Sequence, residues 1–324
     1  MKIGFVGLGN VGSKLAGSLL RNGYQVMVLD LDLNFVANFV ALGASAAESP
    51  KQLAQACDLI ITCLPSPAAC SAVMEGTETE AGIIAGLSAG KIWLEMSTTD
   101  ESEIRRIGAL VKAAGAEPVD CPVSGGCHRA NTGNISIFAG CARATFERAL
   151  PVLTTLGRRV LHTGELGSAS KLKVVTNYLA TAHLVALGEA LTACKVMGLD
   201  MNVSYEGIKA SSGNSFVHET ESQVILNGSR DINFTVDLVL KDVGLFNTLT
   251  QREGMKLDLA PLLVDIFSQA QTQWGPREKS PNIIRRYEEP MGVKVLGVGF
   301  PADLVDDEAE EAGYELRVPD RQDG

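Results

Sequence analysis

The sequence predicts an α/β protein with a doubly wound, largely parallel sheet in its first half and an all-helical domain, joined to it by a long helix, in its second half. Three observations support this prediction. Short β-branched runs alternate with helical patterns up to about residue 163. The stretch from Ser168 to Met197 has no proline and a single internal glycine. The segments beyond it have helical periodicity and no convincing strand.

Seven runs in the first half have the composition of strands. Alternation of such runs with helices is typical of parallel βαβ units, and apolar runs such as Leu59–Ile61 suit a sheet that helices cover on both faces. Ser49 before Pro50 indicates the start of one helix, and Asp100 indicates another. The predicted strands are Ile3–Val6, Gln25–Leu29, Leu59–Cys63, Ile92–Glu95, Glu117–Cys121, Ile135–Ala139 and Arg159–His162.

The second half is predicted to contain the long helix and four shorter ones, at about 202–210, 214–227, 234–252 and 258–273. A length of 324 residues is enough for two domains of ordinary size. The predicted boundaries are residues 1–163 for the sheet domain, 164–289 for the helical domain and 290–324 for an acidic C-terminal tail.

The tail carries most of the net charge of the chain. The formal net charge is −10, and the residues from Glu288 to Gly324 include 11 acidic and 3 basic side chains. We expect so acidic a segment to be solvated and dispensable for chemistry. Within it, Val293–Phe300 has apolar residues that could form a strand on the body of the protein or on another subunit.

Composition and charge exclude several classes of protein. Hydrophobic residues make up 46% and charged residues 20%, which is too apolar for a disordered chain. The acidic balance, without a basic patch, argues against a nucleic-acid or membrane partner. The seven cysteines are never closer than six positions apart, and the four histidines lack an H-x-x-x-H spacing, so no metal site is predicted. Without a signal sequence, and with no apolar stretch judged long enough to span a bilayer, we expect a cytoplasmic protein.

The first predicted strand ends in a glycine-rich motif that continues into an apolar helix. Glycines in this arrangement allow a tight turn, close approach of the backbone to a pyrophosphate, and packing of helix on strand. An ordinary glycine-rich turn is the simpler alternative. Because the motif follows a strand, opens a helix and is followed 18 residues later by Asp30, dinucleotide binding is favoured. The expected cofactor contacts are Gly7, Leu8, Gly9, Asn10, Val11 and Gly12.

Asp30, at the end of the second predicted strand, indicates which dinucleotide is bound. A carboxylate there accepts hydrogen bonds from the ribose hydroxyls and repels a 2′-phosphate. The next two residues, Leu31 and Asp32, offer no cation. The sequence therefore predicts NAD rather than NADP, although Asp30 could serve only as a helix cap.

A second glycine-rich element, Ser124-Gly125-Gly126, follows the predicted strand that ends at Cys121. Such a turn can present a hydroxyl and successive backbone N–H groups to an anion such as a substrate carboxylate. A tight connection that needs glycine for positive φ explains the same residues equally well.

Two pairs of residues in the second half could take part in catalysis. Lys173 and Asn177 are four residues apart on the long helix and so lie on one face, where an ammonium and an amide could handle the proton of a substrate hydroxyl. Phe234 and Asp242 are predicted to share a face of a later helix, with Lys241 beside them. A solvated lysine, and a core phenylalanine beside a surface ion pair, are the plainer interpretations.

Together these motifs resemble those of the β-hydroxyacid dehydrogenase family, over roughly residues 1–288. Residues 7–12 are similar to the family's GLGxMG motif, and Asp120–Gly126 to its DxPVSGG substrate motif. Residues 164–177 are similar to its catalytic stretch, and residues 234–245 to the segment whose lysine reaches the cofactor.

The resemblance implies a fold and a set of roles. The fold is a Rossmann domain joined by a long helix to an all-α domain, with the active site in the cleft between them. Lys173 would be the catalytic lysine and Asn177 its partner, while Phe234 and Asp242 would line the active site. Cofactor contacts are also implied for Leu31, Leu64, Pro65, Thr98 and Lys241. A homodimer or homotetramer is expected.

The sequence departs from the family pattern at a few positions. Val11 replaces a methionine, Thr176 stands where many members have asparagine, and Arg129 replaces a glycine after the substrate turn. Arg129 could bind a second anionic group of the substrate, or it could point to solvent or pair with an acidic neighbour.

The sequence thus predicts an NAD-dependent oxidoreductase of the 3-hydroxyacid dehydrogenase type. Ser124, Gly125 and Gly126 would hold the substrate carboxylate while hydride passes to nicotinamide C4 and Lys173 acts as general acid/base. The alternatives are an NADPH-dependent reductase of glyoxylate or a semialdehyde, and a non-catalytic dinucleotide-binding module.

Overall fold

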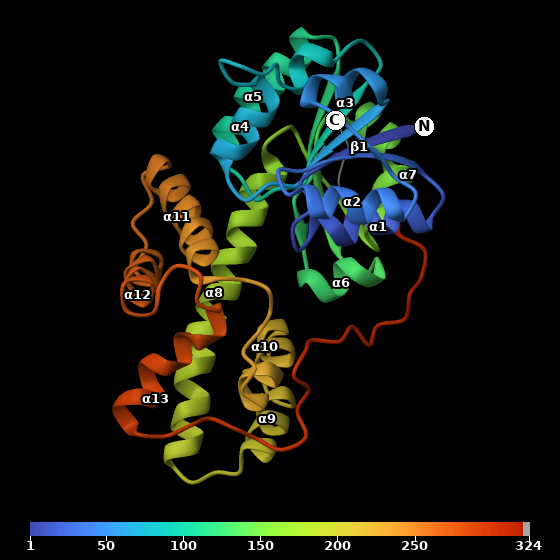
Figure 1. Cartoon of the computed structure of the whole chain (residues 1–324). Helices are drawn as coiled ribbons and strands as arrows, with labels where there is room; N and C mark the ends of the chain where they lie inside the picture. The colour runs from blue at the N-terminus through green and yellow to red at the C-terminus, as the bar shows by residue number, and fades with distance from the viewer. Residues whose placement is uncertain (320–324) are drawn as a thin grey trace. The chain divides into compact units, whose positions relative to one another are not determined.

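The structure, a computed structural model, describes residues 1–319 and divides the chain into two compact units (Figure 1). Unit 1 contains Met1–Lys173 and the described residues from Asp306 on, and unit 2 contains Val174–Val305. The division falls within one continuous helix, α8 (Ser168–Val196).

Unit 1 is built on a ten-stranded sheet whose central strands are parallel. The strand order is β10-β9-β8-β6-β5-β4-β1-β2-β3, with β7 paired to β8. Since β1 lies between β4 and β2, the order reverses beside β1, which is where doubly wound folds bind ligands. The strands are β1 (Lys2–Val6), β2 (Gln25–Leu29), β3 (Ser45–Ala46), β4 (Leu59–Thr62), β5 (Ile92–Glu95), β6 (Glu117–Asp120), β7 (Val123–Ser124), β8 (Ser136–Gly140), β9 (Arg159–Gly164) and β10 (Tyr314–Glu315).

Helices cover both faces of this sheet. On one face α1 (Gly12–Arg21), α2 (Leu33–Ala41), α6 (Gly126–Thr132) and α7 (Arg143–Leu156) contribute to one core, which includes Leu15 and Phe146. On the other face α3 (Pro50–Ala56), α4 (Pro67–Glu75) and α5 (Glu101–Ala113) contribute to a second core, which includes Trp93. A short 3₁₀ helix, η1 (Ile83–Gly86), lies beside α3. The predicted caps are confirmed, because Ser49 accepts from Gln52 N and Asp100 accepts from Ser102 N.

The sheet is not wholly parallel. β8 pairs antiparallel with both β6 and β7, through Asp120↔Gly140 and Val123↔Ile137. β7 begins only three residues after β6 ends, and only α6 lies between β7 and β8. The connection from β7 to β8 is too short for a helical crossover over the sheet, so β8 runs antiparallel. The predicted strand positions were otherwise close, while the two-residue strands β3, β7 and β10 were missed.

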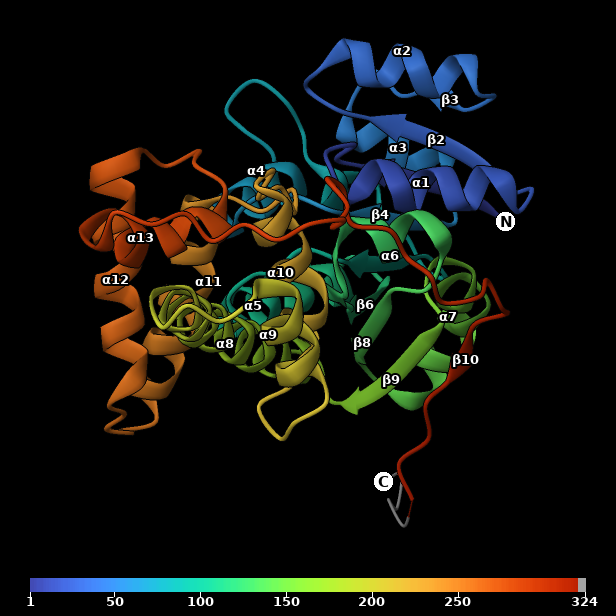
Figure 2. The same cartoon turned by 90° about the horizontal axis from the view of Figure 1, so that it is seen from below.

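The acidic tail is mostly exposed, as its charge predicts, but part of it is held on unit 1. Its described residues from Asp306 on belong to unit 1, where β10 pairs in parallel with β9 at the edge of the sheet (Figure 2). The carboxylate of Glu315 binds Arg143, and that of Glu308 binds Arg159. The sequence did not reveal these contacts, because net charge does not report where counter-charges lie in the fold, and arginines on α7 and β9 supply them.

Unit 2 consists of helices packed around the remainder of α8. They are α9 (Met201–Lys209), α10 (Phe216–Asn227), α11 (Val236–Arg252), α12 (Leu259–Trp274), the 3₁₀ helix η2 (Ser280–Ile284) and α13 (Arg285–Met291). Their core includes Leu191, Ile225, Leu263 and Phe267, all fully buried. The four predicted helices are confirmed within about two residues at each end, and η2 and α13 were missed.

Residues 292–305 have no helix or strand and lie along unit 2. Val295 is fully buried there, and Gly297 N donates to Leu226 O at 2.9 Å. The side chains of Asn202 and Asn227 donate to the carbonyls of Val298 and Phe300, each at 2.7 Å. The strand considered for Val293–Phe300 is therefore absent, and side-chain amides bind this backbone instead.

One prediction about membranes needs correction. Helix α8, at 29 residues, is long and apolar enough to cross a bilayer by length and composition alone. Four of its apolar side chains, Leu184, Val185, Leu187 and Leu191, belong to the core of unit 2, as those of a core helix do.

Candidate active site

The Gly7–Gly12 loop joins β1 to α1 at the carboxyl edge of the parallel strands. Gly7 has φ +96°, and a Cβ there would lie 2.2 Å from the carbonyl oxygen of Cys63. A Cβ on Gly12 would lie 2.0 Å from the carbonyl oxygen of Gly7. At Gly9, by contrast, a Cβ would meet nothing within 4 Å. Two glycines are thus required by packing, and the third keeps a space clear in which a pyrophosphate fits against the backbone.

Asp30 follows β2 and holds this loop in place. One of its carboxylate oxygens accepts a hydrogen bond from Leu8 N at 2.5 Å, and the other accepts from Asp32 N at 2.8 Å. A carboxylate has about four lone-pair sites, so acceptor capacity remains for ribose hydroxyls. Asp32 is the side-chain cap of α2, and Leu31 is fully exposed. The capping role that Asp30 could have had therefore belongs to Asp32.

The ends of β4 and β5 lie next to this loop in the sheet and carry Leu64, Pro65 and Thr98. A buried polar network joins the two ends, since Leu64 N donates to Ser97 Oγ at 2.7 Å. Ser97 N donates to the carboxyl of Glu95 at 2.8 Å, and Thr62 Oγ1 donates to the same group at 2.7 Å. Burial raises the pKa of Glu95, with hydrogen bonds from Ser97 and Thr62 opposing it. Sequence reasoning used Glu95 only as the end of a strand, although a carboxyl closing a buried apolar run was a visible signal.

The Ser124–Gly126 turn links β7 to α6. Gly125 and Gly126 have φ of +130° and +86°, which any other residue would adopt only with strain. Backbone conformation therefore requires both glycines whether or not they bind a ligand. The anion-binding role of Ser124, Gly125 and Gly126 stays a prediction that this geometry permits.

Lys173 lies in the second turn of α8, and its residue is 7% exposed. The start of this helix is fixed by Asp120, the fully buried last residue of β6. The carboxyl of Asp120 accepts hydrogen bonds from Ser170 N and Ser170 Oγ, each at 2.7 Å. The neighbouring Lys171 pairs with Glu101 at 3.6 Å, as a surface lysine does. Lys173 is thus the more enclosed of the two lysines, and Asp120 is a contributor that sequence reasoning missed.

The predicted residues of unit 2 are grouped around Asp242. Its residue is 2% exposed, and its carboxylate accepts from Asn177 Nδ2 at 2.5 Å. Lys241 Nζ lies 3.0 Å from the other carboxylate oxygen. Asn177, Lys241 and Asp242 therefore form one hydrogen-bonded and ion-paired group. Phe234 does not share a helical face with Asp242 as predicted, because α11 begins only at Val236, although Phe234 packs against the core of unit 2.

Arg129, on α6, pairs with the acidic tail. Its guanidinium lies 3.4 Å from Glu308 and 3.9 Å from the carboxylate of Asp306. The Asp306 side chain, which is 2% exposed, also accepts hydrogen bonds from Thr132 Oγ1 and Asn134 Nδ2. Of the alternatives considered for Arg129, pairing with an acidic residue is the one observed, and a second substrate anion would have to compete with two carboxylates.

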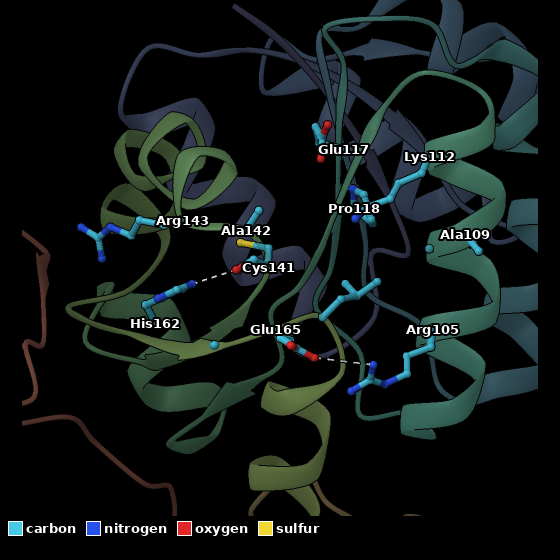
Figure 3. Close-up of a pocket in the computed structure, with 13 residues that line it drawn as sticks. Arg105, Ala109, Lys112, Glu117, Pro118, Cys141, Ala142, Arg143, His162 and Glu165 are labelled. Carbon is cyan, nitrogen blue, oxygen red and sulfur yellow. Dashed lines mark hydrogen bonds and ion pairs between the residues drawn. The ribbon is translucent and has the colours of Figure 1, made fainter. Parts of the chain in front are cut away.

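A pocket of about 540 Å³ opens elsewhere in unit 1, between α5 and the β6–β9 part of the sheet (Figure 3). His162 Nε2 lies 2.9 Å from the carbonyl oxygen of Cys141 there, and Arg105 lies 3.9 Å from Glu165. Both of its arginines are ion-paired, Arg105 with Glu101 and Arg143 with Glu315. None of the predicted site residues lines this pocket, so it is not the candidate active site.

Two family models together match most of the chain. Residues 2–164 match the NAD binding domain of 6-phosphogluconate dehydrogenase. Residues 167–287 match the model described as NAD-binding of NADP-dependent 3-hydroxyisobutyrate dehydrogenase. The two matches together contain all of the predicted site residues.

Individual relatives agree with the family models. The 2-(hydroxymethyl)glutarate dehydrogenase of Eubacterium barkeri is 33% identical over 298 residues, which cover 92% of this chain and 98% of the relative. The 3-sulfolactaldehyde reductase of Escherichia coli is 29% identical, over 90% of this chain and 97% of the relative. Among solved structures, 3-hydroxyisobutyrate dehydrogenase from Salmonella typhimurium has a TM-score of 0.80 at 27% identity, covering 88% of this chain and 99% of that one.

Proposed function

The chain belongs to the 3-hydroxyisobutyrate dehydrogenase-like family of β-hydroxyacid dehydrogenases, and on that premise we propose which substrate, cofactor and residues it uses. It is an NAD-dependent oxidoreductase of the 3-hydroxyacid dehydrogenase type, acting on small hydroxy acids. The observation that carries the residue-level proposal is the placement of Lys173 and Asn177 one turn apart on α8, with Asn177 bound to Asp242.

The proposed cofactor contacts are those of the Gly7–Gly12 loop, Asp30, Leu31, Leu64, Pro65, Thr98 and Lys241. The open space at Gly9 and the spare acceptor capacity of Asp30 support the fit of a dinucleotide. Bound NAD supplies the site at nicotinamide C4 that accepts or returns a hydride. We propose a preference for NAD over NADP, because the Asp30 carboxylate repels a 2′-phosphate and Leu31 offers no counter-charge.

The proposed substrate is a short 3-hydroxy acid, or the corresponding aldehyde acid in the reverse direction. Ser124 Oγ and the N–H groups of Gly125 and Gly126 hold its carboxylate. Lys173, in its neutral form, takes the hydroxyl proton during oxidation and, as ammonium, returns a proton during reduction. Asp242 accepts one N–H of Asn177 and so fixes the orientation of that amide, whose other groups position the substrate oxygen.

The names of the relatives support this substrate class. 2-(Hydroxymethyl)glutarate, L-serine and 3-hydroxyisobutyrate each carry a hydroxymethyl group on the carbon next to a carboxylate. The carboxylate is the group that the Ser124–Gly126 turn is proposed to bind. What differs among these acids is the substituent on the intervening carbon, so discrimination among them falls to residues outside this turn.

The test is an absorbance assay at the NADH band with a panel of 3-hydroxy acids, run with NAD and with NADP. NAD-dependent turnover of at least one acid is expected. Cofactor binding is measured separately by thermal shift, since a ligand that binds only the folded state raises the apparent melting temperature. Binding of NAD without turnover of any acid would favour the non-catalytic module, and turnover with NADPH alone would favour the alternative reductase.

We further propose that the protein is a homodimer or homotetramer and is located in the cytoplasm. Val175 and Leu179, four residues apart on α8, are 37% and 47% exposed, and such an exposed apolar face supports the oligomer. In the described part of the chain no cysteine forms a disulfide, which supports a cytoplasmic location. Light scattering on the purified protein tests the first point, and fractionation of its host cell the second.

A further inference from the structure

Asp120 joins two parts of the proposed active site within unit 1. It is the last residue of β6, and the Ser124–Gly126 turn follows it after three residues. Its side chain reaches 50 residues along the chain to Ser170, which precedes Lys173 by three positions on α8. One side chain thus connects the segment that carries the proposed carboxylate site to the turn of helix that immediately precedes the proposed acid/base.

The contact satisfies backbone groups that a helix leaves without partners. The first N–H groups of an α-helix have no acceptor inside the helix, and a carboxylate near them is favoured by the helix dipole. Lys171 N donates to Gly167 O at 3.1 Å, whereas Ser170 N donates to Asp120 at 2.7 Å. The Gly167 N–H also contributes a hydrogen bond to Asp120. Asp120 therefore acts as a cap for α8, supplied from a distant strand.

We propose that Asp120 is a positioning residue, which holds the first turn of α8 on the end of β6 and thereby sets where Lys173 lies relative to the Ser124–Gly126 turn. The inference rests on the proposed function, in which Lys173 moves the substrate proton. A shift of about 1 Å in a reacting group can lower the rate about 100-fold, so loss of this contact has a kinetic consequence without any change in Lys173 itself.

The surroundings of Asp120 make its protonation state depend on pH. Burial raises its pKa to about 7, although the bonds from Ser170 act in the opposite direction. Glu95 is paired in register with Asp120 on β5 and also raises its pKa. The other titratable neighbours are Cys121 and Cys141, whose thiols stay neutral because burial raises the pKa of both, that of Cys141 to about 12. When Asp120 ionises, both of its oxygens become acceptors, so its hold on Ser170 is strongest above about pH 7.

The test compares Asp120→Asn and Ser170→Ala with a matched control, Ser168→Ala. Ser168 lies in the same first turn but bonds to the Glu165 carbonyl oxygen and Thr163 rather than to Asp120. In Asp120→Asn we expect kcat to fall about 10- to 100-fold with the Kd for NAD unchanged. In the parent we expect kcat to rise with pH through about pH 7 as Asp120 ionises. This rise should be absent in Asp120→Asn. Ser170→Ala should shift kcat in the same direction by less, and Ser168→Ala should resemble the parent.

A second readout does not depend on turnover. The rate at which an amine-reactive ester modifies Lys173, followed by mass spectrometry, should rise several-fold in Asp120→Asn and Ser170→Ala, because the turn that encloses Lys173 is released. If the parent oxidises no hydroxy acid, the proposed function fails, and this labelling still decides the inference about Asp120.

Two results would overturn the inference. One is an Asp120→Asn protein with the parent's kcat, pH profile and Lys173 labelling rate. The other is equal loss of activity in Ser168→Ala and Ser170→Ala, which would indicate a general effect on the helix. If the melting curve shows that Asp120→Asn does not fold, the comparison of kcat and Lys173 labelling between Ser170→Ala and Ser168→Ala decides the inference.

Discussion

At the scale of single residues, the side chains with proposed chemical roles are held by partners rather than exposed to solvent. Asn177 is bound by Asp242, and the first turn of α8, which precedes Lys173, is bound by Asp120. Asp30, a proposed cofactor contact, also holds the Gly7–Gly12 loop by accepting a hydrogen bond from Leu8 N. A catalytic group needs such partners to keep its geometry. Each substitution is therefore expected to remove one identifiable contact.

Lys173→Ala should lower kcat by about 10²- to 10⁴-fold, because the proposed general acid/base is removed from the proton-transfer step. NAD binding should be nearly unchanged, since the glycine-rich loop and Asp30 are untouched. Steady-state kinetics and a fluorescence titration with NADH check both points. Lys171→Ala is the matched control, because Lys171 pairs with Glu101 on the surface. Turnover above half that of the parent would remove Lys173 from the mechanism.

Asp30→Asn should weaken the discrimination between NAD and NADP. In the parent we expect kcat/KM to favour NAD about tenfold or more, because the carboxylate both bonds to ribose and repels a 2′-phosphate. Asparagine keeps an acceptor for Leu8 N but loses the charge, so NADP should gain relative to NAD. Asp32→Ala, which removes the cap of α2, should destabilise the fold without altering the cofactor ratio. Equal use of both cofactors by the parent would mean that Asp30 serves only the loop.

Much of the candidate site could be predicted from sequence, because its motifs are local. These motifs are the glycines after the first strand, a carboxylate after the second strand, and a lysine and asparagine one helical turn apart. Each can be recognised from residues that are close together in the sequence. Asp120 and Glu95 could not be assigned in the same way, since their partners Ser170 and Thr62 are distant in sequence and are found only when strands and helix are assembled.

At the scale of elements, the described tail residues from Asp306 on are a structural part of unit 1. Asp306 bonds to Thr132 and Asn134, and its neighbours supply β10 and the carboxylates for the arginines of α7 and β9. Sequence patterns predicted the helices and long strands well, because hydrophobic periodicity extends over many residues. Short strands such as β10 have no such periodicity and form because an edge of the sheet offers hydrogen-bonding partners.

Asp306→Ala should destabilise the protein by about 1–3 kcal/mol, the usual consequence of leaving buried hydrogen-bond donors without an acceptor. The donors are Thr132 Oγ1 and Asn134 Nδ2, and Arg129 loses part of its ion pairing. Denaturant unfolding of the full chain measures this difference. Asp307→Ala, at the adjacent exposed position, is the control and should stay within about 0.5 kcal/mol of the parent. Equal stability of the two variants would show that the Asp306 contact contributes nothing.

At the scale of the whole molecule, the free energy of unfolding depends on pH in two opposite ways, one from the paired carboxyls of the tail and one from the buried carboxyl of Asp120. Bonds from Arg159 lower the pKa of Glu308, and those from Arg143 lower the pKa of Glu315. Burial raises the pKa of Asp306, but bonds from Thr132 and Asn134 outweigh it, so the pKa is lowered. A lowered pKa contributes stability above the unfolded value, near pH 4, which is lost as pH falls through the folded pKa.

Asp120 acts in the other direction. Its pKa is raised from 3.8 to about 7, so folding disfavours its ionised form, and stability declines between about pH 4 and pH 7. We therefore expect the melting temperature to fall on the acid side as the tail carboxylates are protonated, and also to fall from about pH 4 toward pH 7. Calorimetry across this range should show that Asp120→Asn flattens only the second decline. An unchanged profile in that variant would mean that Asp120 is already ionised in the folded protein at acid pH.

The division between the two units lies inside helix α8, not in a linker, and this constrains how such a chain can be recombined. Protein engineers who exchange substrate-recognition halves between relatives usually cut where two modules meet, which here is the peptide bond between Lys173 and Val174. A crossover at that bond would take Lys173 from one parent and Asn177 from the other, and would splice two sequences within a single helical turn. Chimeras joined before Gly164 or after Val196 keep the whole helix from one parent and are the ones we expect to remain active.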